Sequence, residues 1–459
     1  MYTLNDYVDI SRVIEDSSYA KNMGLIVKSQ KIKSVKDIEN KLKAIPSDDP
    51  DWREKVMSLK RDLAEAKQAA GKRLHVIKYN KNSLNSTNIS TLGLFRSVIT
   101  DGSRVVSFAP PKSYSIDDFM SLTEHNTMDN LEFSDFVEGT MINMFVNPIT
   151  NEWEIATRSN IGARCKFYQD NDSTFRQMFL EAFSKKQYEF SMFDRSLSYS
   201  WVLQHPDNKI VNPIASPNIV LTHIFAFNDV TEKDGNTTHM VEDVLDRFNR
   251  TEFINTESKI HTPEEHPEKP IHEYIQVYKN GQTDYRIMGT VVRDTITGAR
   301  TKIRNDHYEY VKNLKGNSPK LQYRYYHLRQ LNAVKDYLKY YPEDRPKFSK
   351  FRDQMHKFTE TLWRNYMRCY VHKEKPLKEF PFEYRSHMYQ LHQFYINNLR
   401  ADGGRIDKLA TIQYVNSLKP GYLMHSINYP LKKRSTDEIG EVIKEKVEEL
   451  KLEVPDETA

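Results

Sequence analysis

The spacing of apolar positions changes twice along the chain, and these changes predict how it is divided. Residues 1–80 are rich in helix formers, and Val56, Leu59 and Leu63 follow a three-to-four-residue spacing. Short β-branched and aromatic runs then predict strands, until helical spacing returns after Pro319. We therefore expect an N-terminal helical region at 1–80, a strand-rich domain at 81–320, an all-helical domain at 321–434 and a charged tail at 435–459.

The strand-rich domain is predicted to have an α+β fold, in which antiparallel sheets are interrupted by helices. The predicted strands are Leu74–Tyr79, Leu92–Ile99, Arg104–Phe108, Thr140–Val146, Glu152–Thr157, Ser198–Leu203, Ile219–Phe227 and Arg286–Arg293. The predicted helices of this domain are Thr174–Phe183 and Met240–Asn249, and those of the C-terminal domain are Tyr325–Tyr340, Pro346–Cys369 and Glu383–Leu399.

The composition excludes some classes of protein and leaves others open. With 38% hydrophobic residues, 27 Tyr and 22 Phe, the chain is too apolar and too aromatic for a disordered protein. A formal net charge of +4 does not by itself indicate nucleic acid. The two cysteines, Cys165 and Cys369, fit a reducing compartment, and no signal peptide or membrane-length apolar run is present. We expect a soluble, intracellular protein with no membrane partner.

Common phosphate and metal motifs are missing from the sequence. It contains no Gly-Lys-Ser/Thr phosphate loop, no dinucleotide fingerprint and no zincin helix. His261, His266 and His272 gather in a Pro-rich segment and could hold a metal, but we interpret them as solvated loop residues. No metal site is predicted.

An ordered series of segments carries more information than any single motif. The series consists of Gly93–Ser97, Arg104–Ser113, Phe136–Ile142, Trp153–Ser159, His205–Val211, Gly289–Val292 and Lys302–Asn305. In order and spacing it resembles the ATP-dependent RNA ligases of T-even bacteriophages and their relatives, including proteins of large DNA viruses. The resemblance extends from Leu92 to Arg329. It implies a nucleotidyltransferase fold, and the helical C-terminal domain also fits phage-type ligases.

The residues that ligation requires are only partly present. In this family a lysine amine attacks the α-phosphorus of ATP, and carboxylates hold Mg²⁺ and the ribose. Phe136 stands at the lysine position, followed by the matching Glu138 and Gly139. Met288 replaces a carboxylate before Gly289, and residues 199–204 contain no acid. The resemblance therefore implies a ligase fold that has lost its nucleophile.

The cations of the family pattern are better preserved than its acids. Arg158, Lys302 and Arg304 match positions that contact phosphates, and Lys112 matches an upstream lysine. Together with Glu138 and Gly139 they form the predicted nucleotide or phosphate site, in a cleft more positive than that of an active ligase. Alternatively, these cations pair with sheet-edge acids such as Glu154 and Asp294.

A second basic and aromatic cluster precedes the helical domain. Its candidate RNA-binding residues are Lys315, Lys320, Tyr323 and Arg324. Cations supply phosphate affinity, and aromatic faces stack on unpaired bases. Alternatively, this segment is a helix face whose tyrosines point inward and whose cations are solvated.

The sequence thus favours a catalytically degenerate, RNA-ligase-like protein of viral origin that binds RNA or a nucleotide without a cofactor. One alternative is an active ligase in which Lys112 is a displaced nucleophile, with ATP and Mg²⁺ as cofactors. The other is a virion structural or assembly protein that reuses the fold and binds other viral proteins. The expected location is the host cytoplasm, a viral factory or the virion.

Overall fold

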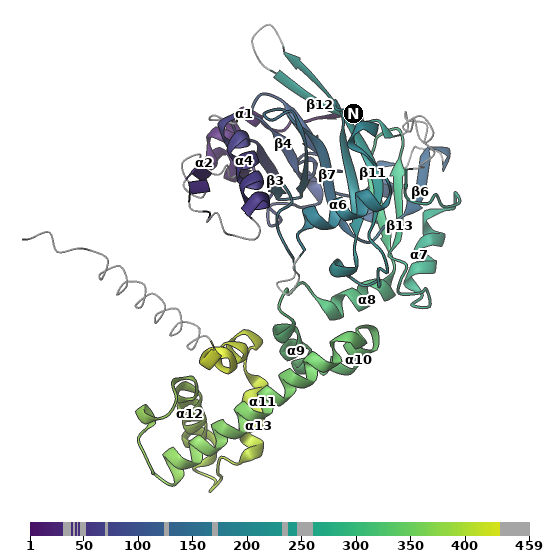
Figure 1. Ribbon diagram of the computed structural model, residues 1–459. Helices are drawn as coiled ribbons and strands as arrows, with labels where there is room; N and C mark the ends of the chain where they lie inside the picture. The colour runs from purple at the N-terminus through teal and green to yellow at the C-terminus, as the bar shows by residue number, and fades with distance from the viewer. Residues whose placement is uncertain are drawn as a thin grey trace, which may run out of the picture. The chain divides into compact units, whose positions relative to one another are not determined.

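The computed structural model describes residues 1–30, 38–39, 42–43, 45, 52–68, 72–123, 128–167, 173–231, 237–245 and 260–431. The chain divides into two compact units, Met1–Tyr310 and Val311–Ala459. We describe each unit by itself (Figure 1). The predicted charged tail at 435–459 lies outside the described residues.

The first unit contains three sheets, and all their strand pairings are antiparallel. The largest has the order β1 (Tyr2–Thr3), β12 (Thr237–Asp243), β11 (Asn218–Thr231), β10 (Ser198–Gln204), β7 (Thr140–Asn147), β8 (Glu152–Thr157) and β9 (Asn160–Ile161). The second has the order β2 (Leu25–Ser29), β3 (His75–Tyr79), β4 (Val98–Thr100) and β5 (Val105–Phe108). The third has the order β14 (Arg300–Arg304), β13 (Gly289–Asp294) and β6 (Leu131–Asp135). The predicted α+β fold with antiparallel sheets is confirmed.

Helices surround these sheets (Figure 1). Within the described part of the first unit they are α1 (Ile10–Glu15), α2 (Ser17–Asn22), α4 (Trp52–Gln68), α5 (Ile116–Leu122), α6 (Phe175–Lys185) and α7 (Ile271–Lys279). Helix α6 begins at Thr174, which exchanges side-chain and backbone hydrogen bonds with Gln177 in a capping box. Its Phe179 and Phe183 pack edge-on against Trp201 of β10, which anchors the helix on the large sheet.

The four-stranded sheet has a buried face on each side. On one side Val76 and Ile99 share a core with Phe145 and Ala156 of the large sheet. On the other side its strands share a core with α1, α2, β11 and β12. Because residues on both faces are buried, the four-stranded sheet is held firmly on the large one, while Ile26 and Lys28 at its β2 edge stay exposed.

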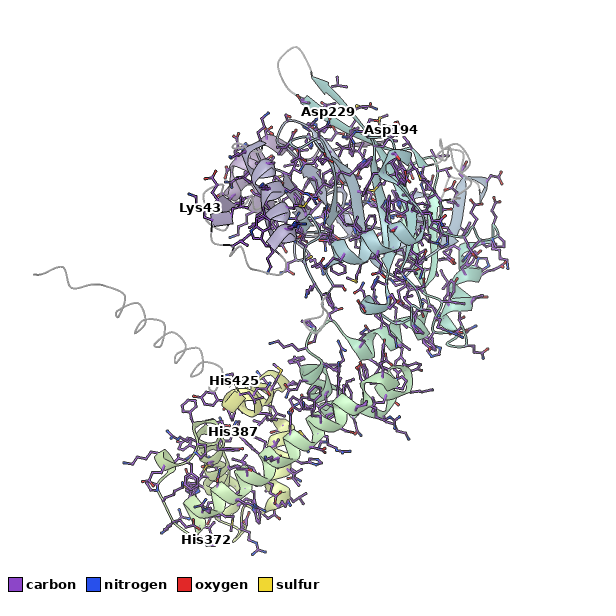
Figure 2. All side chains as sticks on the ribbon, viewed as in Figure 1. Lys43, Asp194, Asp229, His372, His387 and His425 are labelled. Carbon is purple, nitrogen blue, oxygen red and sulfur yellow. The ribbon has the colours of Figure 1, made fainter. Side chains whose placement is uncertain are left out.

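The second unit is helical. Its helices are the last part of α8 (Asp306–Lys315), then α9 (Leu321–Gln330), α10 (Val334–Tyr340), α11 (Arg345–Tyr366), α12 (Phe382–Phe394), α13 (Lys408–Ser417) and residues 420–431. Aromatic residues form its core: Tyr337 stacks on Tyr341 at 4.6 Å and on Phe348 at 5.1 Å between ring centroids. A buried histidine, His387, accepts or donates hydrogen bonds at 2.8 Å to Tyr414 and to Ser426 (Figure 2). This core ties α12 to the helices that follow it.

Two predicted elements have the wrong type. Met240–Asn249 was expected to be a helix, but residues 237–243 form β12, which pairs with both β11 and β1. The apolar spacing imitates a helix, yet His239 and Val241 alternate inward as in a strand. Asp229, near the far end of the β11–β12 hairpin, lies 2.8 Å from His239 (Figure 2). The predicted strand Leu92–Ile99 is a 3₁₀ turn at Leu92–Leu94 followed by the short β4.

Other predictions were incomplete. The first 80 residues were expected to be helical up to the strand at Leu74–Tyr79, which is β3, but they also supply β1 and β2, whose partners lie far along the chain. The long helix predicted at Tyr325–Tyr340 is broken between α9 and α10, where Asn332 adopts a positive φ of 58°. Within the described ranges, no helix is long and apolar enough to cross a membrane.

Candidate phosphate-binding site

Phe136 lies beside two cations because of the register of the small sheet. It follows β6, and its backbone N–H donates to the carbonyl of Gly289 at 3.0 Å. Gly289 in turn pairs with Arg304 of β14. Glycine has no side chain to separate its neighbours, so Lys302 Nζ lies 4.2 Å and Arg304 Cζ 5.2 Å from the centroid of the Phe136 ring. A cation–π arrangement therefore stands at Phe136, the residue that the resemblance matches to the nucleophilic lysine.

Strand β14 turns its three cations to one face of the sheet. Side chains alternate along a strand, so Arg300, Lys302 and Arg304 share one face while Thr301 and Ile303 are buried on the other. Arg300 is buried, Lys302 is half-buried and Arg304 is exposed. The strand thus carries positive charge from the interior to the surface.

The segment Ala109–Lys112 brings further cations to the same place. Carbonyls of its two prolines accept hydrogen bonds from Arg96 (3.4 Å, to Pro110) and from Arg300 (2.5 Å, to Pro111). Lys112 is fixed by its backbone N–H, which donates to Gly93 at 2.9 Å. We call Arg96, Lys112, Arg300, Lys302 and Arg304 the basic cluster.

The basic cluster is electrostatically unfavourable without a ligand. Burial lowers the pKa of Lys302 well below its usual value, and Arg300, Arg96, Arg304 and Lys112 lower it further. Burial, followed by Arg304, Arg96 and Arg300, also lowers the pKa of Lys112. The pKa of Arg300 falls to about 10, first by burial and then by Arg96. An anion placed among these groups would relieve their mutual repulsion.

His223 of β11 lies beside Arg300, with the buried carboxylate of Asp243 3.9 Å from its Nε2. Arg300 Nη1 lies 3.3 Å from His223 Nε2, and since arginine only donates, Nε2 must accept and the proton sits on Nδ1. Neither His223 Nδ1 nor Arg300 Nε, both buried, has a hydrogen-bond partner among the described residues. Burial first, then Arg300, lowers the pKa of His223 well below its usual value, so the ring stays neutral.

The retained acid, Glu138, has a structural role. Its buried carboxylate accepts the backbone N–H groups of Val211 at 3.0 Å and Asn212 at 3.1 Å. Its backbone carbonyl accepts a hydrogen bond from the side chain of Gln204 on β10. Residues 199–204 of that strand contain no acid. The carboxylate thus holds the loop after His205. Among the residues that the structure describes, no group of three His, Cys, Asp or Glu could hold a metal ion.

Glu154 and Asp294 were the acids expected as alternative partners of these cations. Glu154 binds Arg176 at 2.6 Å, so it is engaged elsewhere. Asp294 accepts the backbone N–H groups of Ile296 at 2.8 Å and Thr297 at 3.1 Å, in the turn after β13. Arg304 pairs at 2.6 Å with Glu309 instead. Glu154 thus has another partner, while Arg304 pairs with Glu309, and Asp243 lies close enough to Arg300 to raise its pKa.

Arg158 adjoins the basic cluster rather than lying inside it. Its Nε donates to the carbonyl of Arg96 at 3.1 Å, and its guanidinium lies 4.5 Å from the centroid of the Tyr79 ring. The stacked guanidinium is therefore held in place beside Arg96 and half-buried.

The Pro-rich loop positions Phe136. His266 lies 2.7 Å from Asp135, the residue before Phe136, and 3.0 Å from Thr290, the residue after Gly289. His261 and His272 do not join it: His261 lies near Asn218, and His272 is exposed at the start of α7. The three histidines are thus dispersed, and His266, predicted to be a solvated loop residue, instead ties the loop to the small sheet.

The predicted RNA-binding residues of the helical unit divide into two pairs. Lys315 and Arg324 are buried; Arg324 donates to the carbonyl of Ser318 at 2.7 Å, and Lys315 lies 5.4 Å from the Tyr341 ring. Lys320 is exposed and Tyr323 is half-buried. The first pair thus has packing roles, and RNA contact remains a prediction for the second.

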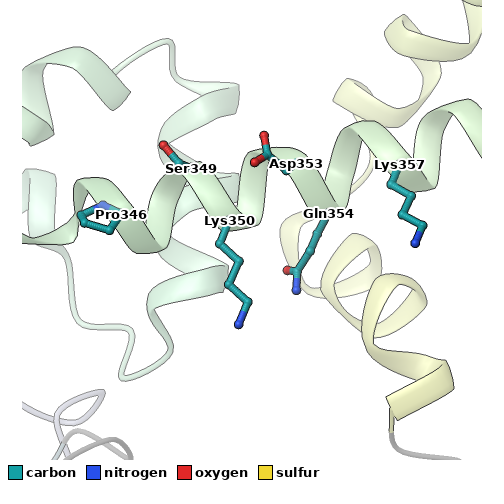
Figure 3. Close-up of a pocket in the computed structure, with 6 residues that line it drawn as sticks. All are labelled: Pro346, Ser349, Lys350, Asp353, Gln354 and Lys357. Carbon is teal, nitrogen blue, oxygen red and sulfur yellow. The ribbon is translucent and has the colours of Figure 1, made fainter.

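The helical unit also presents a groove and an apolar stripe. The groove, of about 500 Å³, is lined along α11 by Pro346, Ser349, Lys350, Asp353, Gln354 and Lys357 (Figure 3). Figure 3 shows Lys350, Gln354 and Lys357 on one side of the helix. On α12, Phe382 is 61% and Tyr389 53% exposed, which is the kind of surface that an assembly protein would use.

Comparison with known proteins supports an RNA-ligase-like relationship. No family model matches the chain. An RNA ligase of Rhodothermus phage RM378 is 28% identical over 93 residues, which are 18% of this chain and 20% of the ligase. The match thus spans about a fifth of that relative's length.

Two solved ligases align with the chain more broadly but loosely. An RNA ligase of Naegleria gruberi, in a mutant with ATP and Mn, aligns with 50% of this chain and 64% of its own, at 9% identity and a TM-score of 0.31. An archaeal ATP-dependent RNA ligase aligns with 80% of this chain and 73% of its own, at 12% identity and a TM-score of 0.30.

Reasoning from the sequence missed Arg96, Arg300 and His223. A signal for Arg300 was present, because Arg300, Lys302 and Arg304 recur at every second position, as cations on one face of a strand do. Arg96 and His223 carry no such signal, since they reach the site from other strands and loops.

Proposed function

We propose that this chain is an RNA-ligase-like protein that no longer forms a lysyl-adenylate and instead binds the phosphate groups of RNA or a nucleotide at the basic cluster. One observation carries the proposal: Phe136 stands at the lysine position and stacks beneath Lys302 and Arg304. The aromatic ring removes the nucleophile and leaves the cations that would hold a phosphate.

Binding without metal chemistry follows from the surrounding groups. The carboxylate of Glu138 accepts hydrogen bonds from two backbone N–H groups, and the side chain of Met288 has no oxygen that could bind a metal. Charge-assisted hydrogen bonds from lysine and arginine bind phosphate without a divalent ion. The crowding of like charges supplies the driving force, since a bound polyanion relieves it.

The test is calorimetric titration with metal-free ATP and with a 5′-phosphorylated RNA tetranucleotide. Lys302→Met keeps an aliphatic side chain against Phe136 and removes the charge. Lys112→Met likewise removes the charge at position 112. We expect each variant to weaken binding by about ten- to a hundredfold, the range for a charged hydrogen bond. Lys185→Met and Lys279→Met, at exposed positions on α6 and α7, should leave affinity unchanged. Equal binding by all four variants would refute the proposal.

A displaced nucleophile is the second candidate, because the pKa of Lys112 and of Lys302 is lowered and an uncharged amine can attack phosphorus. The amine would attack the α-phosphorus of ATP, and pyrophosphate would leave. Incubation with ATP labelled at the α-phosphate and Mg²⁺ or Mn²⁺ decides between the candidates. Covalent label that resists alkali, is released by acid as a lysine phosphoramidate is, and disappears in Lys112→Ala or Lys302→Ala would establish the enzyme. The binding proposal predicts no label.

A further inference from the structure

The four-stranded sheet carries a second group of cations. Lys28 on β2 pairs in register with Val76, and Lys78 on β3 pairs with Ile26. The two lysines are therefore diagonal neighbours on one face of the sheet. Lys81 follows β3, and both Lys28 and Lys81 are exposed.

Arg158 connects these lysines to the basic cluster. Lys78 Nζ donates to the hydroxyl of Ser159 at 2.7 Å. The preceding residue, Arg158, donates to the carbonyl of Arg96, a cluster member, at 3.1 Å. The cations thus succeed one another from β2, through Arg158 and Arg96, to β14.

Acids are missing from the segments that form this path. Residues 20–30, 72–82 and 157–166 contain lysines and arginines but no Asp or Glu. Burial lowers the pKa of Lys78 most, and Lys28, Arg158 and Lys81 lower it further. Successive cations in three segments that contain no acids complement the phosphodiesters of one nucleic-acid strand.

We propose that Lys28, Lys78 and Lys81, here called the basic track, bind the phosphodiester backbone of a single-stranded RNA whose end occupies the basic cluster. The inference rests on the proposed function, because it extends the same site from a terminal phosphate to a strand. It also names the ligand: a polynucleotide rather than a free nucleotide.

The experiment compares two 5′-phosphorylated RNAs, a tetranucleotide and an unstructured oligomer about three times as long, by fluorescence anisotropy. The variant is Lys28→Gln, Lys78→Gln and Lys81→Gln together. Its affinity for the longer RNA should fall to that for the tetranucleotide, whose binding should not change. Each phosphate neutralised contributes about 0.7 to the slope of log affinity against log salt, so three lysines should lower its magnitude by about 2.

A control and a second variant keep the result interpretable. The control replaces three exposed lysines of the same unit, Lys185, Lys269 and Lys279, with glutamine and should retain both affinities. Because Lys78 is half-buried, the variant with only Lys28→Gln and Lys81→Gln is measured as well, and its slope should fall by about 1.4.

The outcomes separate this inference from the proposed function. Loss confined to the longer RNA supports the basic track. Wild-type binding of the longer RNA by both track variants, with weak binding of both RNAs by Lys302→Met, overturns the track and leaves the proposed function standing. If the wild type binds neither RNA, or Lys302→Met binds both normally, the proposed function fails and the inference fails with it.

Discussion

Lys302 and Phe136 form a cation–π pair, with the ammonium nitrogen 4.2 Å from the ring centroid. The pair joins two strands of the small sheet across Gly289, whose missing side chain lets them meet. A lysine in place of the phenylalanine would stand among Lys302, Arg304 and Lys112. The cations of the cluster are therefore arranged around an aromatic ring, and a lysine in its place would increase their mutual repulsion.

Restoring the lysine alone should not restore chemistry. We expect Phe136→Lys to form no covalent, alkali-stable adduct with α-labelled ATP, because it adds a cation to a crowded site while Met288 still supplies no carboxylate. The measurement is label retained on a denaturing gel in Mg²⁺ and in Mn²⁺. Phe136→Lys combined with Met288→Glu is the matched comparison. Label on the single variant would show that the remaining groups still suffice for adenylyl transfer.

Phosphate binding should take up a proton. In the free protein Lys302 has a lowered pKa, through burial and through Arg300, Arg96, Arg304 and Lys112, and a bound phosphate raises it again. Affinity should therefore be greatest below the lowered pKa and fall as pH rises through it, by up to about tenfold per pH unit. Calorimetry in buffers of different ionisation enthalpy measures the uptake. Lys302→Met should abolish it; unchanged uptake in that variant would assign the proton to another group.

The two glycines beside the altered positions should be indispensable for stability. Gly139 has φ +155°, and a Cβ there would lie 2.4 Å from the carbonyl oxygen of Leu203; Gly289 has φ +135° and would meet the oxygen of Ile303 at 2.0 Å. We expect Gly139→Ala and Gly289→Ala each to lower the free energy of unfolding by about 1–3 kcal/mol or more. Chemical denaturation measures this. Gly102→Ala, where a Cβ has open space although φ is +99°, isolates the cost of backbone strain from that of the clash.

The helical unit should lose stability as pH falls. Burial lowers the pKa of His387 to about 4, from an ordinary value of 6.5. Below about pH 6.5 the unfolded chain takes up a proton that the folded chain refuses, so the stabilisation present at neutral pH is lost between about pH 6.5 and 4. The total loss is roughly 3 kcal/mol. Unfolding followed across this range should show a shallower pH dependence for His387→Gln, and an identical slope in both proteins would contradict the assignment.

The sequence predicted the regular strands well and the irregular joins poorly. Strand β8 was predicted at its observed bounds, Glu152–Thr157, because β-branched and aromatic residues fill a short run between turns. The segment at 240–249 failed because its strand depends on partners on either side, β11 and β1, that local spacing does not reveal. The general rule is that tertiary pairing overrides a local helical pattern.

For the candidate site, the sequence identified the residues that match the motif order of the RNA ligases it resembles, and the structure identified their neighbours in space. Phe136, Lys302 and Arg304 were identified from the resemblance. The environment that lowers the pKa of Lys302 was not, since it includes Arg96, which lies in the turn before β4 and donates to the carbonyl of Pro110. Burial of Arg324 was likewise invisible, because an arginine in a basic, tyrosine-rich segment reads equally as surface or core.

The close approach of backbone at Gly139 and Gly289 has a consequence for tracing the ancestry of such proteins. At each position a side chain would collide with a neighbouring carbonyl oxygen, and this holds regardless of which residues precede the glycine. Selection for folding alone would preserve both while the nucleophile and the carboxylate drift. Glycines in a sequence motif of this kind therefore reflect close contacts between strands. A sequence search that gives them much weight would not separate active enzymes from relatives that have lost catalytic residues.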